Sequence, residues 1–135
     1  MHLDDYLDAA SRRPWIYGGG HDGWQGHDCT LFLANWAHSF GRGDPGVYRG
    51  TYATKEEAVA IIERARGLVP LIMTALVNVG WRGRDGDPQD GDIGVVVCDG
   101  IDVGAIRRGR RWIIADEHQL AHLPGNLFIR TVWHP

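Results

Sequence analysis

The spacing of the apolar residues changes near residue 90, and that change limits the chain to a mixed fold. Before this point apolar residues recur at intervals of three and four, which is the period of an amphipathic helix. After it, short β-branched runs are separated by tight-turn dipeptides such as Asp99-Gly100, a pattern typical of an antiparallel meander. Because helices come first and strands follow, we expect an α+β class. The 135 residues suit a single domain, with a helical part at about 1–80 and a sheet part at about 90–135.

Four helices are predicted in the first part. A short helix covers Leu3 to Arg12, and the clearest one covers Asp28 to Phe40 with a continuous apolar stripe. Asp28 belongs to the residue types that cap helices, which puts Cys29 in the first turn. Thr54 opens the next helix as part of a capping box, and residues 70–79 form the last.

Four strands are predicted at residues 92–98, 101–107, 110–115 and 127–133. The glycine-rich segment 15–26 reads as a loop, because it lacks both the Walker lysine and the spacing of the dinucleotide fingerprint. Segment 81–89 is charged and also reads as a loop. Four arginines flank the second hairpin turn, either as a solvated tip or as a docking site for an acidic neighbour: Arg107, Arg108, Arg110 and Arg111.

Composition excludes several classes of function. The net charge is −3, so no basic excess exists to neutralise a nucleic-acid backbone, and we expect no nucleic-acid partner. No apolar run is long enough to span a bilayer. The first residues are acidic and lack the basic, then apolar, order of a signal peptide. Two cysteines are too few for a disulfide framework.

Cys29 is the residue whose position most suggests chemistry. Backbone N–H groups in the first turn of a helix favour a thiolate, which is the reactive form of cysteine. The alternative is that Cys29 is only the first member of the apolar stripe. Cys98 ends a strand and is expected to be an inert thiol. His118 and His122 are four residues apart and could share a helix face, but they lack carboxylate partners, so we expect no metal and no cofactor.

The segment Trp24-x-x-His27-Asp28-Cys29-x-x-Phe32-x-Ala34-x-Trp36 resembles the nucleophile helix of NlpC-type, papain-like cysteine peptidases. It looks even more like a small phage- and prophage-associated family related to them. The other motifs that carry this resemblance are Gly43-Asp44-Pro45, Tyr48-x-x-x-Tyr52, a following helix with Ala58, Gly91-Asp92-Ile93 and Val103-Gly104. Together they cover the chain from about Trp24 to Trp133.

This resemblance implies a papain-like fold, with the cysteine helix packed on an antiparallel sheet. It also implies a phage-type tail or tail-tip setting, in the host cytoplasm during assembly and then in the particle, beside other tail proteins. In active NlpC-type enzymes the strand after Gly-Asp begins His-Val-Gly, and that histidine is the base. Here the same stretch reads Asp102-Val103-Gly104, so an aspartate occupies the base position. The ordinary pKa of aspartate, about 4, makes it a poor acceptor of a thiol proton.

Two functions therefore stay open. The first is a degenerate peptidase that acts structurally or in binding. The second is an active cysteine hydrolase that cleaves peptidoglycan peptides with Cys29 as nucleophile and with His27, His21 or His118 as an alternative base.

The six tryptophans are candidates either for contact with a partner or for core packing. Trp15, Trp24 and Trp81 fall in predicted loops and are candidates for contact with a protein or glycan partner. The alternative for them is core packing, which is the expectation for Trp36 and Trp112.

Overall fold

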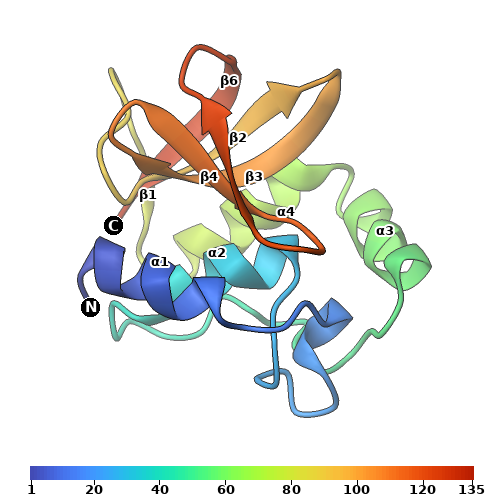
Figure 1. The fold of residues 1–135 in the computed structure, drawn as a ribbon. Helices are drawn as coiled ribbons and strands as arrows, with labels where there is room; N and C mark the ends of the chain where they lie inside the picture. Colours follow the sequence, from blue (N-terminus) through green and yellow to red (C-terminus); the bar gives the residue numbers. More distant parts are fainter.

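The computed structural model describes residues 1–135 and confirms the α+β class. The helical elements are α1 (Leu3–Ser11), the 3₁₀ turn η1 (Tyr17–Gly19), α2 (Cys29–His38), α3 (Lys55–Arg64) and α4 (Leu68–Val77). The strands are β1 (Arg82–Gly83), β2 (Ile93–Cys98), β3 (Ile101–Arg108), β4 (Arg111–Ala115), β5 (Leu120–Pro124) and β6 (Phe128–His134). Figure 1 shows α1, α2 and α4 on one side of the sheet, with α3 set apart from them.

Local sequence explains where the helices begin. The Asp28 side chain accepts hydrogen bonds from the second and third residues of α2, as predicted. Thr54 caps α3, but the Glu57 carboxylate accepts from Ala53 N (3.1 Å) and not from Thr54 N, so the capping box is displaced by one residue. α4 begins two residues before the predicted start at Pro70, because a proline in the first turn needs no intrahelical N–H bond.

One antiparallel sheet holds all six strands in the order β1-β6-β2-β3-β4-β5. β1 and β5 were not expected. β5 pairs with β4 from Ala115 opposite Leu120 to Arg111 opposite Pro124, and a proline is tolerated there because β5 is an edge strand. His118 lies in the turn before β5 and His122 on the strand, so the helix face that they might have shared does not exist.

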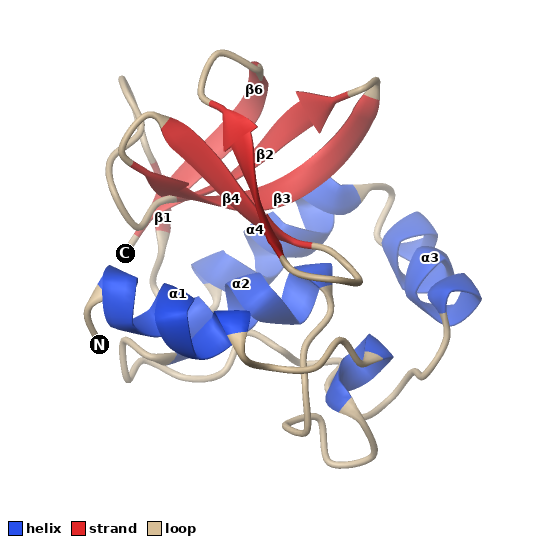
Figure 2. Cartoon of the chain, viewed as in Figure 1, coloured by secondary structure: helices blue, strands red, loops and turns tan.

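The sheet buries residues on both faces. Figure 2 shows the helices against one face, where the main core includes Phe32, Trp36, Ile93, Ile106 and Trp133. The opposite face holds a second, smaller cluster of Val96, Ala105, Trp112 and Val132. The helices lie against the first face only. Of the helices, α2 packs most closely on the sheet, through β3 and β4.

Two charged segments form ion pairs within the chain. Asp92 is 1% exposed and pairs with Arg84, which anchors the segment before β2. In the arginine cluster, Arg108 pairs with Asp4 at 2.6 Å, and Arg107 donates to the Gly109 carbonyl at 2.9 Å. Half of the predicted basic docking site is thus bound within the chain. None of the helices is long and apolar enough to cross a membrane.

Candidate functional site

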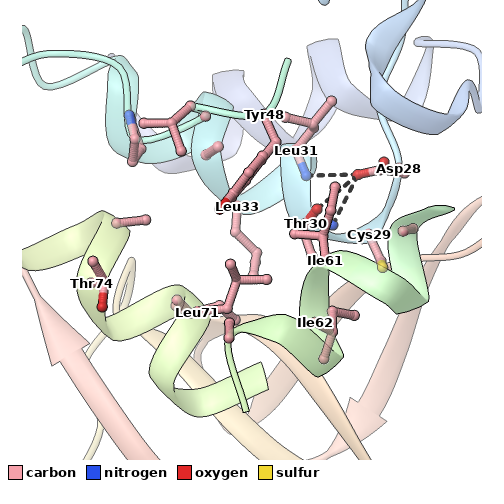
Figure 3. Close-up of a pocket in the computed structure, with 18 of the residues that line it drawn as sticks. Asp28, Cys29, Thr30, Leu31, Leu33, Tyr48, Ile61, Ile62, Leu71 and Thr74 are labelled. Atoms are coloured by element: carbon pink, nitrogen blue, oxygen red, sulfur yellow. Dashed lines mark hydrogen bonds between the residues drawn. The ribbon is translucent and has the colours of Figure 1, made fainter. Parts of the chain in front are cut away.

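The Asp28 carboxylate organises the start of α2. It is 2% exposed, and its Oδ1 accepts from Leu31 N at 2.9 Å, Thr30 N at 3.2 Å and Thr30 Oγ1 at 3.0 Å (Figure 3). Its Oδ2 accepts from Gly18 N at 3.0 Å and from the Tyr52 hydroxyl. Five donors therefore satisfy this buried carboxylate, which ties η1, the connector before α3 and α2 to one point.

Glycine is needed at the η1 contact. Gly18 has a φ of +71°, and an added Cβ would collide with the carbonyl oxygen of Tyr52. The Gly18 carbonyl also accepts from Gly50 N at 2.8 Å. The glycine-rich loop thus closes on the connector with no room for a side chain, which is why the loop carries glycine there.

Cys29 lies at the rim of a cavity. Its side chain is exposed, and Figure 3 shows its sulfur among residues that line this cavity. The apolar surroundings raise the pKa of the Cys29 thiol above its ordinary value, and the neighbouring Asp28 carboxylate acts in the same direction. The backbone N–H groups of the first turn oppose this rise without overcoming it. The thiol is therefore predominantly protonated at neutral pH.

The cavity lies between α2, α3, α4 and the connector that precedes α3. Its volume is about 290 Å³, and 16 of its 23 lining residues are hydrophobic. Tyr17 and Tyr52 also line it, and the Tyr17 hydroxyl is 3.3 Å from Glu117 Oε1 in the turn before β5. The sequence singled out Tyr52 only as part of the Tyr48-x-x-x-Tyr52 motif and did not predict the cavity, because helical spacing does not show how far apart two helices pack.

Asp102 lies on the sheet face that packs against α2. Strand alternation puts Asp102 on the same face as Gly104, whose added Cβ would meet Leu33 Cδ1 at 2.5 Å. Further along α2, Trp36 Nε1 donates to the Gly91 carbonyl at 2.8 Å, and Gly91 is hydrogen-bonded to the far end of β3. α2 and β3 therefore run in the same direction, and the first turn of the helix lies toward Asp102.

The Asp102 carboxylate is bound to an arginine. Arg130 Nε donates to Asp102 Oδ1 at 3.0 Å, across the intervening strand β2. Arg130 is the extra residue of a bulge in β6, since Thr131 pairs with Val95 and Ile129 with Val96. Bulges redirect side chains, and this one directs Arg130 to the position where the resemblance implies a base.

None of the candidate histidine bases lines the cavity. His27 is 3% exposed and packs edge-on against Phe32, and its Nδ1 has no hydrogen-bond partner. Burial, aided by Arg13, lowers the pKa of His27 below its ordinary value. His21 is exposed in the glycine-rich loop, and His118 is exposed in the turn before β5. No group of three or more His, Cys, Asp or Glu side chains is arranged to hold a metal.

The three loop tryptophans have three different environments. Trp81 is 1% exposed and belongs to the main core, where it packs on Phe40. The prediction that it contacts a partner is therefore wrong. The charged residues that follow it made the segment look like an exposed loop. Trp15 is half-buried against that core. Trp24 is 44% exposed, but the Arg49 guanidinium covers one part of its ring at 3.7 Å. Of these three tryptophans, only Trp24 keeps a large exposed aromatic surface.

Comparison with known proteins gives a family and no function. No curated protein and no solved structure matches the chain. One family model matches residues 1–134, which is nearly the whole chain. The chain belongs to the family described as a domain of unknown function, DUF6950.

Proposed function

We propose that this chain is a papain-like, NlpC-related domain that has lost its hydrolase chemistry and acts structurally or in binding, as a component of a phage-type tail or tail tip. One observation carries the loss of chemistry. Cys29 occupies the start of the helix that packs on the sheet, while the base position holds Asp102, which is paired with Arg130. A cysteine nucleophile needs an adjacent base, and the lining of the cavity beside Cys29 contains no imidazole.

Electrostatics at Cys29 support the same conclusion. A catalytic cysteine has a lowered pKa, because the thiolate is the form that attacks a carbonyl carbon. At Cys29 the apolar walls and the Asp28 carboxylate raise the pKa. Asp28 cannot turn away from the thiol without breaking the cap of α2 and the bonds to Gly18 and Tyr52. Asp28, which caps α2, thus also makes the Cys29 thiol a weaker nucleophile.

The setting in a phage-type particle is supported by the sequence resemblance between about Trp24 and Trp133. Mass spectrometry of purified, induced particles from the source strain tests it. We expect peptides of this chain to cosediment with assembled tails. Their absence from particles that contain the other tail proteins would contradict the setting.

Hydrolysis of purified peptidoglycan tests the loss of chemistry. We expect the unaltered chain, Cys29→Ala and the matched control Cys98→Ala to release the same background of soluble peptides. Release by the unaltered chain and by Cys98→Ala, but not by Cys29→Ala, would overturn the proposal in favour of an active cysteine hydrolase. An Asp102→His variant with Arg130→Ala adds a direct comparison, because it places an imidazole at the base position and frees it from the arginine.

A further inference from the structure

The wall of the cavity beside Cys29 is formed mainly by aliphatic side chains. Three helices contribute aliphatic side chains, among them Leu33, Ala34, Ile61, Ile62, Leu71 and Ala75 (Figure 3). No phenylalanine or tryptophan lines it, and its only aromatic rings are three tyrosines. A mainly aliphatic wall, with ring surfaces only at these three tyrosines, suits a flexible hydrocarbon chain better than a planar ligand.

The polar groups at the cavity limit the head group that such a ligand can carry. The lining contains no lysine, arginine, histidine or glutamate, and Asp28 is its single charged residue. The two carboxylate oxygens of Asp28 already accept five hydrogen bonds. An anionic head group would find no cation in this wall and would meet the negative charge of Asp28.

The geometry points to a binding site for the saturated hydrocarbon chain of a single-chain amphiphile with an uncharged head group. The chain lies between α2, α3 and α4, and the head group lies at the rim by Cys29, where the wall opens to solvent. A volume of about 290 Å³ equals roughly ten water molecules at about 30 Å³ each, and a methylene group has nearly the same volume. This inference goes beyond the proposed function, because it requires neither a catalytic residue nor a phage-type particle.

A series of primary alcohols from 1-hexanol to 1-tetradecanol tests the site on the intact chain. Titration calorimetry measures affinity, and the rate of iodoacetamide labelling at Cys29 reports occupation of the cavity, with Cys98 as the internal reference. We expect affinity to rise about fourfold per added methylene and to level off near 1-decanol or 1-dodecanol, where the cavity is full. Occupation should slow labelling of Cys29 and leave Cys98 unchanged. No binding, or affinity that rises through 1-tetradecanol without levelling, would overturn the inference.

Matched variants locate the ligand. Ala75→Phe fills the cavity from α4, and Met73→Phe adds a ring on the exposed side of the same helix. We expect at least tenfold weaker binding of 1-decanol to Ala75→Phe and unchanged binding to Met73→Phe. The pair Ala58→Phe and Val59→Phe repeats this contrast on α3, should Ala75→Phe fail to fold. Equal binding by the two members of a folded pair would contradict the site.

Two further probes test the head group and the source of the chain. Sodium dodecanoate should bind at least tenfold more weakly than 1-dodecanol, and equal binding would overturn the assignment of an uncharged head group. Phosphatidylcholine vesicles should leave Cys29 labelling unchanged. Protection by vesicles without protection by alcohols would assign the surface to a bilayer and not to a free amphiphile. Neither probe reads out hydrolysis, so failure here is separable from failure of the proposed function.

Discussion

Helix α2 has a filled side and a hollow side. On its filled side, Phe32 is completely buried against Tyr6 of α1, and Trp36 donates to the backbone before β2. Toward α3 and α4, the same helix borders a cavity of about 290 Å³, and α3 buries only Ile61. The Asp28 cap fixes where the helix starts and therefore where Cys29 lies. The hollow side leaves that residue beside apolar space, with no base among the residues that line it.

Removal of the Asp28 carboxylate should have the largest effect on stability, because this carboxylate joins the start of α2 to η1 and to the connector before α3. In Asp28→Ala the N–H groups of Gly18 and Leu31 and the Tyr52 hydroxyl lose their buried acceptor. We expect a loss of about 3–5 kcal/mol in the free energy of unfolding, measured by urea denaturation. Asp8→Ala, which removes an exposed ion pair with Arg12, is the control and should stay close to the unaltered chain. A loss below about 1 kcal/mol for Asp28→Ala would show that the five donors find other partners.

Two glycines test the contrast between filled and hollow sides directly. An alanine Cβ at Gly94 would meet the Trp112 ring at 2.7 Å in the second cluster, where Trp112 is completely buried. An alanine Cβ at Gly104 would meet the terminal methyl of Leu33 at 2.5 Å, but Leu33 borders the cavity and can move into it. We expect Gly94→Ala to cost about 2–3 kcal/mol and Gly104→Ala below about 1 kcal/mol. Equal losses of unfolding free energy in the two variants, or the reverse order, would mean that Leu33 cannot move into the cavity.

A smaller effect is expected from His27 on acidification. Because the pKa of His27 is lowered in the fold, the unfolded chain takes up a proton at this residue before the folded chain does. Its contribution is intact above the ordinary value of 6.5 and is lost as the pH falls below it, by up to about 1 kcal/mol per pH unit. His27→Gln should therefore lose less stability than the unaltered chain between pH 7 and pH 5.5. A parallel pH dependence in the two proteins would contradict this, and the exposed His122→Gln is the control.

The filled side was largely predictable from the sequence, and the hollow side was not. The Asp28 cap and the apolar stripe of α2 are local signals, so both the helix and the place of Cys29 followed from spacing. β5 was missed because Leu120–Pro124 ends in a proline, which a sheet tolerates at an edge strand. Trp81 was misjudged because burial depends on Phe40, which is distant in sequence. The cavity depends on where α3 stands, and no residue spacing encodes that position.

The pH dependence of Cys29 alkylation tests the central claim that this helix holds an unactivated thiol. Iodoacetamide labelling is followed by mass spectrometry, residue by residue, with Cys98 in the same chain as reference. Because apolar surroundings and Asp28 raise the pKa of Cys29, we predict that its labelling rate keeps rising above the midpoint of free cysteine, about pH 8.5. A rate that reaches its plateau by neutral pH would show a stabilised thiolate. That result would contradict the account and return Cys29 to the role of a nucleophile.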